Sequence, residues 1–553
     1  MNQFDVIVVG GGLAGICAAQ QALRTGAKTA LITKGWLGGI GVRGSGASGC
    51  GTSEGGEPAF FRLLEKSFDA DSFQERIINA GLGMVERDMV SFFAEEFMKM
   101  KSAAEEIMSC YQQPGPFSLG IPLVRRYLDF VRKSAKIYCQ TTVAQLLIRD
   151  NVCNGTLCVD ESTGETFGLY GKAVILTAGG DAGLFSVNVH PECVSGDGYA
   201  LGLKAGAEAI NLEFMQIFTM TTAPTRNLIH FVNEEYLSSL YNTEGKEFLS
   251  RYLPQGITLA ECIRENTLHA PFSVRDKASR YLAIGIVEEI KAGRATPSGG
   301  IYVDLRDCPS FRDTPQDHFF RYRGIDVWAH PVEVSMGFQC CNGGLRINRK
   351  METTVAGLFA AGENAGGLHG ADRLGGNMLA GCIISGKIAG QQAAGCAKNC
   401  ARTEHLPYQP RELIAAKPDL AKQYAPLIME IRQSAWDNLL VIKSNSSINR
   451  FGARIDEICE EARRIAPNPG AVPVEMENLL ILGKALAKTA LERKESRGGF
   501  YREDYPYPAQ GRPEAHILTL SEAGTGEVAL RKEVLDPQWN PDFKNRLDKE
   551  RWG

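Results

Sequence analysis

The sequence lacks the patterns that mark a membrane protein or a protein-bound metal cluster. No stretch of its 553 residues approaches the ~18 consecutive apolar side chains of a membrane-spanning helix. The first residues, Met-Asn-Gln-Phe-Asp-Val, show no basic region followed by an apolar run, so we expect no signal peptide. None of the 15 cysteines forms a CxxC pair. This argues against an iron–sulfur cluster held by this chain and favours a reduced, cytoplasmic setting.

An excess of charge of one sign is also missing. The chain carries 60 basic and 64 acidic residues, for a net charge of −4 and a pI near 6.2. The bulk charge therefore gives no indication of binding to nucleic acid or to an anionic membrane. Hydrophobic residues make up 44% and charged residues 22%, which excludes a disordered chain. A length of this size corresponds to about three or four domains.

Glycine is abundant and clustered. A typical soluble protein of this length has about 39 glycines, whereas this sequence has 60. Residues 1–60 hold 15 of them, residues 166–206 hold nine and residues 337–390 hold 13, without a Gly-X-Y period. Glycine is needed where a Cβ would clash or where φ is positive. The backbone is therefore expected to come close to a ligand or to itself at three places far apart in sequence.

The first cluster predicts a dinucleotide site. Residues 5–9 read as a buried strand, Gly10–Gly15 follow at once, residues 14–24 have helical spacing, and residues 28–33 read as a second strand. This strand–turn–helix–strand order is the context in which glycines approach a pyrophosphate at a helix N-terminus. A tight turn in an unliganded α/β protein is the alternative. The second strand ends in Thr33-Lys34 rather than in an acid, so FAD fits better than NAD.

Two later clusters repeat the strand-to-glycine pattern, and their spread suits one extended cofactor. Residues 173–180 form one such unit, followed by Ser195-Gly-Asp-Gly and a small-residue helix at 200–207. Residues 357–363 form the other, which continues into a helix after Leu379.

The overall pattern predicts an α/β fold: a Rossmann-type FAD-binding domain with an inserted α+β capping domain and a C-terminal helical domain. We place the discontinuous FAD-binding domain at 1–225 and 336–402 and the cap at 226–335. The helical domain follows at 403–514, and a hairpin and tail at 515–553. Within the helical domain we expect helices at about 411–435, 438–466 and 476–494.

Seven segments together resemble the flavoprotein subunit of the succinate dehydrogenase/fumarate reductase family, which includes aspartate oxidase and the alpha subunit of adenylylsulfate reductase. They are GGGLAG at 10–15, ILTAGG at 175–180, SGDGYALGLKAGA at 195–207, RDKASR at 275–280, NGG at 342–344, GLFAAGENAGGLHGADRLGGNML at 357–379 and ESRGGFYREDYP at 495–506.

The resemblance implies that FAD lies in the Rossmann-type domain, that the cap closes over its ring, and that a hydride passes between flavin N5 and a substrate carbon. Gly10, Gly12 and Gly15 would lie against the pyrophosphate of FAD. Glu363 and Asn377 would contact its ribityl chain and ring. Alternatively, Glu363 is a surface-turn carboxylate and Asn377 caps the next helix. The further positions expected to contact the cofactor are Leu13, Ala14, Thr33, Lys34, Gly39, Ser45, Gly46, Ala178, Gly179, Asp197, Gly362, Arg373 and Leu379.

Two arginines match those that carry the chemistry of dicarboxylate members. Arg275 corresponds to the proton donor or acceptor at the substrate carbon, and Arg373 to a residue that grips a substrate carboxylate. Because an arginine has an intrinsic pKa above ~12, the acid role of Arg275 needs an electropositive, desolvated site. Structural pairings with Asp276 and with Asp372 are the alternatives.

The departures from the family bear on the substrate and on the flavin linkage. Phe218, Gln339 and Phe500 stand where family members have histidines, so we expect a larger, more apolar or less anionic substrate than succinate, bound near Phe218, Gln339, Cys340 and Arg373. Cys340 and its neighbour Cys341 are interpreted as small buried side chains, with a redox thiol as the alternative. No histidine precedes His190, which predicts non-covalent FAD.

The function predicted is FAD-dependent oxidation or reduction of an enoate, carboxylate or acyl-type substrate, in which the electron partner is a separate ferredoxin-like iron–sulfur subunit. Two alternatives stay open. One is attack of a sulfur oxyanion on the flavin, as the resemblance to adenylylsulfate reductase implies. The other is a flavoprotein subunit that relays electrons and has no substrate of its own.

Overall fold

A strand, a glycine turn and a helix open the structure, as the sequence predicts. The computed structural model describes residues 3–35, 37, 60, 63–102, 120–229, 235, 239–268, 271–274, 278–400, 418–466, 472–521 and 527–539. β1 (Gln3–Val9) leads through Gly10–Gly12 into α1 (Leu13–Arg24), and β2 (Thr29–Ile32) pairs with β1 in parallel.

The main sheet extends this unit on both sides. Among the described residues it has seven strands in the order β3-β2-β1-β6-β5-β4, with β14 also paired to β6. The added strands are β3 (Lys136–Tyr138), β4 (Thr141–Arg149), β5 (Val152–Asp160), β6 (Thr166–Leu176) and β14 (Leu358–Ala360). β1 and β14 pair in parallel with the same end of β6. The strands that precede the three glycine clusters therefore end at one edge of the sheet.

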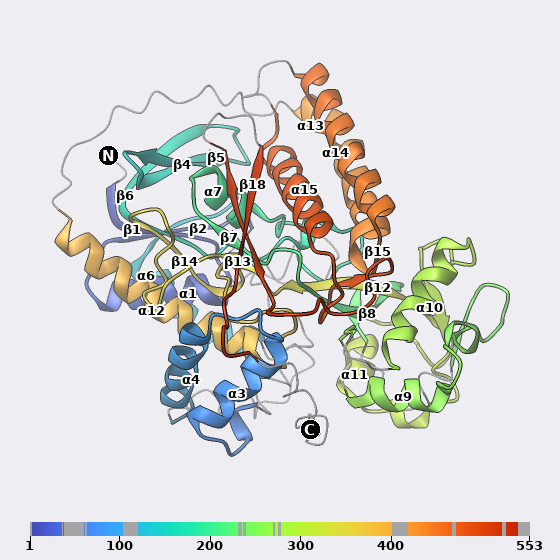
Figure 1. Ribbon diagram of the computed structural model, residues 1–553. Helices are drawn as coiled ribbons and strands as arrows, with labels where there is room; N and C mark the ends of the chain where they lie inside the picture. The colour runs from blue at the N-terminus through green and yellow to red at the C-terminus, as the bar shows by residue number, and fades with distance from the viewer. Residues whose placement is uncertain are drawn as a thin grey trace.

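A long helix of small residues lies against α1 along one side of this sheet (Figure 1). This helix, α12 (Asn377–Asn399), is the one expected after the third glycine cluster. A Cβ at Gly386 would lie 2.5 Å from Ala14 O, and one at Gly390 would lie 2.2 Å from Ala18 O. The two backbones therefore touch, and larger side chains would force the helices apart.

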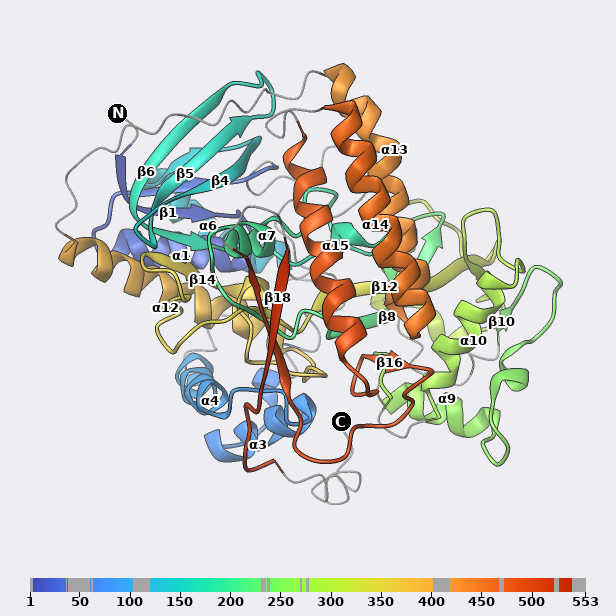
Figure 2. The ribbon, with the colours of Figure 1, turned by 45° about the horizontal axis from the view of Figure 1, so that its top comes forward.

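A second, antiparallel sheet carries the insertion. Its order is β10-β11-β12-β8-β9, built from β8 (Met215–Ala223), β9 (Asn227–Leu228), β10 (Leu240–Tyr241), β11 (Ile301–Val303) and β12 (Val332–Cys341). The helices α9 (Leu259–Leu268), α10 (Arg280–Lys291) and α11 (Pro315–Tyr322) lie together beyond it, away from the main sheet (Figures 1 and 2). β12 runs across the predicted boundary at residue 336, and the domain limits stay a prediction.

Three helices stand side by side in the C-terminal region (Figure 2). They are α13 (Pro418–Ala435), α14 (Asn445–Ile465) and α15 (Val474–Glu492). α14 begins several residues later than the sequence pattern indicates, because Ser444 caps it: Ser447 N donates to Ser444 Oγ at 3.3 Å. Before the cap, Trp436 Nε1 donates to Met336 O of β12 at 2.8 Å and so attaches these helices to the second sheet.

The remaining elements surround this core. They are α3 (Ala70–Gly81), α4 (Arg87–Ser102), α6 (Gly120–Ser134), α7 (Asp197–Lys204), β7 (Ala209–Ile210), β13 (Gly344–Leu345), β15 (Ile442–Lys443), β16 (Tyr501–Arg502), β17 (Ala515–Leu520) and β18 (Val528–Glu533). The β17–β18 hairpin joins β7 and β13 in a further sheet. No helix among the described residues is long and apolar enough to cross a membrane.

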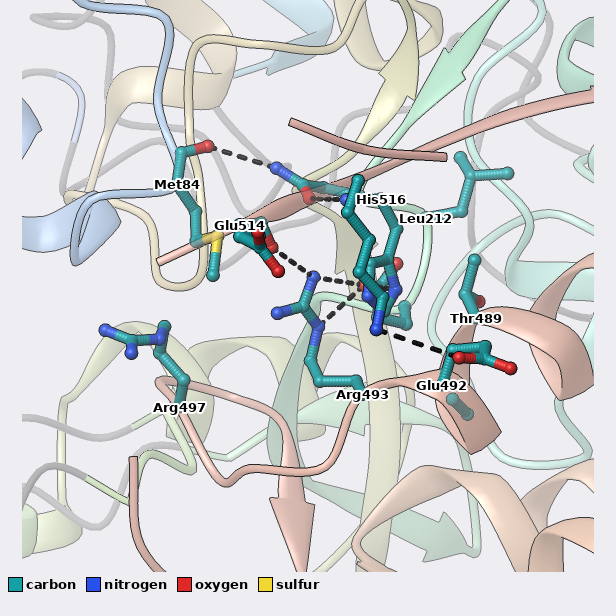
Figure 3. A network of polar contacts seen from close by, with 12 residues as sticks. Met84, Leu212, Thr489, Glu492, Arg493, Arg497, Glu514 and His516 are labelled. Carbon is teal, nitrogen blue, oxygen red and sulfur yellow. Dashed lines mark hydrogen bonds and ion pairs between the residues drawn. The ribbon is translucent and has the colours of Figure 1, made fainter. Parts of the chain in front are cut away.

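A buried ionic network connects the C-terminal segments to the rest of the chain (Figure 3). Arg493 lies at its centre: it is 2.7 Å from Glu213 and 2.9 Å from Glu495, and it donates to Glu514 O at 3.2 Å. Arg497 pairs with Glu495 at 2.7 Å and donates to Leu82 O. Burial opposes ionisation of Glu213, but Arg493 and His516 hold its pKa down to about 2. The network thus joins four distant segments by balanced charge.

We expect Arg493→Met to destabilise the protein by about 3–5 kcal/mol, because it leaves the Glu213 carboxylate buried without its main counter-charge. The double variant Arg493→Met/Glu213→Gln removes that orphaned charge and should recover part of the loss. The shift of the urea unfolding midpoint measures both effects. Arg531→Met, at a half-exposed arginine, is the control and should change stability by less than about 1 kcal/mol. Equal losses in the single and double variants would contradict the prediction.

Candidate functional site

A single elongated cavity collects most of the residues that the glycine clusters single out. The space between its atoms is about 1310 Å³ when the open mouth is included. Val9, Ile32 and Thr177 line it from the ends of β1, β2 and β6. Gln339 and Arg373 line it near β12 and α12. It thus follows the edge at which the parallel strands end, where α/β folds bind nucleotides.

The glycine turn after β1 leaves the start of α1 open to an anion. Gly12 precedes the helix and gives its first turn no side-chain cap, so the first N–H groups remain free for a ligand. Gly10 has φ of +116°, and a Cβ there would lie 2.1 Å from Thr177 O. A Cβ at Gly15 would lie 1.9 Å from Gly10 O. Only glycine fits these positions, and the geometry suits a pyrophosphate.

The cation at the end of β2 is already paired. Lys34 Nζ lies 2.6 Å from Asp197 Oδ2 and donates to Ser195 Oγ at 2.8 Å. Asn478 of α15 donates to the other oxygen of Asp197 at 2.9 Å. Burial disfavours both charges, yet the pairing lowers the pKa of Asp197 and raises that of Lys34. Since its charge is balanced within the protein, Lys34 is compatible with a neutral ribose.

At the other end of the cavity Arg373 is held by neutral groups. Its Nη2 donates to Gln216 Oε1, and its Nη1 donates to Leu374 O at 3.3 Å. The Asp372 carboxylate accepts from the backbone N–H of Arg373 at 3.0 Å. Cys340 donates to Gln216 Oε1 at 3.5 Å. Arg373 is only 7% exposed, so its charge lies in a largely desolvated setting.

Two carboxyl groups lie behind this end. Asp181 follows β6 and Glu363 follows β14, which are paired strands. Cys341 N donates to Glu363 Oε1 at 2.9 Å, and Glu363 lines the cavity from the short turn Gly362–Asn364. Burial raises the pKa of both acids to about 7, and the charge of Glu363 adds to the effect on Asp181. Because both cannot ionise cheaply together, the pair retains a proton near neutral pH.

Several buried polar atoms at this end have no hydrogen-bond partner within the described residues. They are Gln339 Oε1, Arg373 Nε and both amide atoms of Asn377. Buried polar atoms are normally paired, so their clustering points to a ligand with polar edges. Asn377 is the first residue of α12, with Gly376 as the N-cap, so it does not cap that helix. The open helix start, the glycine contacts and these orphaned atoms together fit FAD.

The structure brings together most of the predicted site residues. Those that line the cavity are Gly10, Gly12, Leu13, Ala14, Thr33, Lys34, Ala178, Gly179, Asp197, Gln339, Cys340, Glu363, Arg373 and Leu379. Gly15, Gly362 and Asn377 lie beside it, within one residue of lining positions. Phe218 packs with Met220, Val187 and Val189 and is not among the lining residues. Gly39, Ser45, Gly46 and Arg275 lie outside the described residues.

Some lining residues have no prediction from the sequence. His190 is the clearest: it donates from Nε2 to Gln339 O, and burial lowers its pKa, so the ring is neutral. Its position five residues before Ser195 was the one available signal. Cys193, Met378 and Cys382 also line the cavity. Burial raises the pKa of Cys340 to about 12 and raises that of Cys341 well above its ordinary value, so both are thiols rather than reactive thiolates.

Comparison with known proteins agrees with this site. The FAD binding domain family matches residues 5–379, and the fumarate reductase flavoprotein C-terminal family matches residues 429–547. An uncharacterised FAD-dependent oxidoreductase of Methanocaldococcus jannaschii is 32% identical over 403 residues, covering 70% of this chain and 71% of its own length. One chain of the CoM/CoB fumarate reductase of Methanothermobacter marburgensis is 28% identical over 561 residues, covering 93% of this chain and 96% of its own length.

A solved structure shows the same fold over the whole chain. A chain of the E. coli quinol fumarate reductase superposes with a TM-score of 0.74 at 21% identity and covers 98% of both chains. The fold class and the FAD cofactor predicted from the sequence are confirmed.

We expect Asp181→Asn to raise the thermal unfolding midpoint by about 2 °C at pH 8 and to leave it unchanged at pH 5. Because the folded-state pKa of the acid pair is raised, the native protein binds more protons than the unfolded chain between about pH 4 and pH 7, and its stability falls as the pH rises. The amide removes this penalty. Differential scanning fluorimetry across pH 5–8 measures it, with the exposed Asp71→Asn as control. A pH-independent difference would show that the two acids do not share a proton.

Proposed function

Because the chain belongs to the family of FAD-dependent oxidoreductases that includes the flavoprotein subunits of succinate dehydrogenase and fumarate reductase, we propose that it transfers a hydride between FAD and a carbon of a small anionic substrate. The substrate we propose is an enoate, carboxylate or acyl-type compound other than plain succinate. When bound, FAD supplies the hydride acceptor or donor at N5. The protein supplies the phosphate contacts, the anion grip and the proton.

The observation that carries this proposal is the setting of Arg373. Its guanidinium reaches the cavity beside Gln339 and Cys340, neither of which carries a charge there. A guanidinium binds a carboxylate through two parallel hydrogen bonds and so fixes its orientation. Gln339 stands where the family resemblance places a histidine that binds a dicarboxylate. Arg373 is a strong cation beside the neutral Gln339 and Cys340, and the Glu363 carboxyl in the same cavity is partly protonated near pH 7. This setting favours a substrate with a single anionic group at this end.

We propose separate roles for the two arginines. Arg373 holds the anionic group of the substrate, while Arg275 moves the proton at the substrate carbon. The role of Arg275 rests on the RDKASR segment alone, since residues 275–277 lie outside the described part of the chain. Phe218 would shape the pocket from behind rather than touch the substrate.

Two further proposals concern the cofactor and the partner. FAD is bound without a covalent link, because the sequence has no histidine before His190 and His190 is engaged with Gln339 O. Electrons pass to or from a separate iron–sulfur protein, as in the complexes that the family resemblance suggests. Among the described residues no group of His, Cys, Asp and Glu side chains is arranged to hold a metal ion.

A stopped-flow panel on the reduced protein tests the reaction. We expect an enoate with one carboxylate to reoxidise the flavin faster than fumarate does. Arg373→Met should lower kcat/KM for that enoate by about 10–100-fold, because a charged hydrogen-bond donor is lost. Arg531→Met, far from the cavity, is the matched control.

The same experiment separates the alternatives. Bleaching of the oxidised flavin by sulfite plus AMP, without reoxidation of the reduced flavin by any enoate, would favour attack of a sulfur oxyanion. A flavin spectrum that responds to neither class would overturn the proposed reaction and would favour a flavoprotein that only relays electrons.

Native purification followed by acid precipitation tests the cofactor link and the partner together. We expect an iron–sulfur protein to co-elute, as identified by mass spectrometry, and all the FAD to remain in the supernatant after precipitation. Flavin that stays on the precipitated chain would contradict the non-covalent link. A chain that elutes alone and is reoxidised by oxygen at a catalytic rate would contradict the partner.

A further inference from the structure

One buried glutamine contacts Arg373 from behind, at a position that has no part in the proposed reaction. Gln216 lies near the start of β8 and is 2% exposed. In the antiparallel pairing of β8 with β12 it stands opposite Cys340. It does not line the cavity, whereas both Arg373 and Cys340 do. Gln216 is therefore placed to act on the cavity through these two residues.

The glutamine amide grips Arg373 at two points. Its Oε1 accepts from Arg373 Nη2, and its Nε2 donates to Arg373 O at 3.1 Å. The same oxygen also accepts from Cys340 Sγ at 3.5 Å. A guanidinium only donates and a carbonyl only accepts, so the orientation of the amide is fixed by its neighbours. Side chain and backbone of Arg373 are thereby tied to one rigid group on a central strand.

Within the described part of the chain, the hydrogen bonds of Arg373 leave its charge without a directly bonded carboxylate. The acid that senses this charge is Glu363, whose pKa burial raises to about 7 against the attraction of Arg373, so it is only partly ionised near neutral pH. A buried cation is usually matched by a carboxylate, but here the guanidinium donates to two neutral acceptors in the described residues, Gln216 Oε1 and Leu374 O. Its Nε is buried without a hydrogen-bond partner in that part of the chain. A desolvated positive charge with a free donor gains most from an anion that enters the cavity.

We propose that Gln216 is a positioning residue that aims Arg373 and keeps its positive charge available for one anionic group of the substrate. The ligand class is a carboxylate or an oxyanion of similar size. This inference rests on the proposed function, in which Arg373 grips the substrate anion. A carboxylate at position 216 would preserve the shape and the hydrogen bond from Arg373 Nη2, but it would lose the donor to Arg373 O and would cancel the charge. The choice of an amide therefore keeps both contacts and leaves the positive charge for an anion.

Binding of propionate to the oxidised holoenzyme tests the proposal, because a saturated monocarboxylate bound to oxidised flavin is not turned over. The dissociation constant is read from the change in the flavin absorption spectrum. We expect Gln216→Glu to weaken binding at pH 8 by about 30-fold or more and Gln216→Leu by about 10-fold. Thr219→Val, a buried neighbour on the same strand, should bind as the wild type does.

If Gln216 had only a structural role, its replacement would not change how propionate binding depends on pH. The pH dependence of binding therefore distinguishes the two roles. With Gln216→Glu, binding should recover toward the wild-type value as the pH falls and the introduced carboxylate is protonated. Wild type and Gln216→Leu should share the weaker pH dependence that the Glu363 carboxyl, with its pKa raised to about 7 beside Arg373, imposes on the cavity. The recovery that Gln216→Glu shows beyond theirs is the effect of position 216. The ratio of bound FAD to protein should stay equal in all variants, since Gln216 does not line the cavity.

Three outcomes would overturn the inference. They are wild-type propionate binding in Gln216→Glu at every pH, loss of FAD in parallel with loss of propionate binding, and no binding of propionate by the wild type. The proposed hydride transfer fails separately, when no enoate reoxidises the reduced wild type. If no enoate reoxidises the flavin but propionate binding still follows the expected pattern, the inference that Gln216 positions Arg373 stands without the proposed hydride transfer.

Discussion

The close approach of backbone to backbone at the end of β1 is the constraint on which the rest of the site depends. Gly10 and Gly15 leave no room for a Cβ beside Thr177 O and Gly10 O, so the start of α1 sits directly against the end of β6. The same strand carries β14 on its other side, and the loop after β14 supplies Glu363 and Arg373. Gly386 and Gly390 then let α12 touch α1. Three distant stretches of chain meet at one edge because glycine permits each contact.

Charge is distributed unevenly over this framework. In the network around Arg493, every buried cation has a carboxylate within about 3 Å: Glu213 and Glu495 balance Arg493 and Arg497. Lys34 is likewise balanced by Asp197. Arg373 differs, since its guanidinium donates to neutral oxygens among the described residues. A buried charge costs free energy unless a counter-charge compensates it. Lys443 is also buried beside neutral oxygens, but burial lowers its pKa to about 7, so it can lose its charge. A guanidinium stays protonated, and Arg373 therefore holds a positive charge at the cavity wall.

The parts of this architecture that depend on local sequence patterns could be predicted from the sequence. The first strand, glycine turn and helix were predicted almost to the residue, because runs of β-branched residues and glycines determine the conformation of residues only a few positions away. The start of α14 was missed, since residues 438–440 belong to a π-helical turn and residues 442–443 to β15, and the side-chain cap at Ser444 begins the helix only after them. Gln216 and His190 were also missed as site residues. Their roles arise from the pairing of β8 with β12 and from a contact with Gln339 O, 149 residues away, and no local pattern encodes such distances.

The cofactor was easier to predict than the substrate for a physical reason. The glycine turn that fits FAD is shaped by backbone contacts, and backbone geometry restricts the residue type: at Gly10 a Cβ would lie 2.1 Å from a carbonyl oxygen, so the sequence must show glycine. The other end of the cavity takes side chains from β12, which pairs with β8 through main-chain hydrogen bonds whatever side chains the two strands carry. Residues such as Gln339 can therefore change without moving a strand. The side chains whose charge and shape select a substrate can thus vary, whereas the backbone framework that carries them cannot.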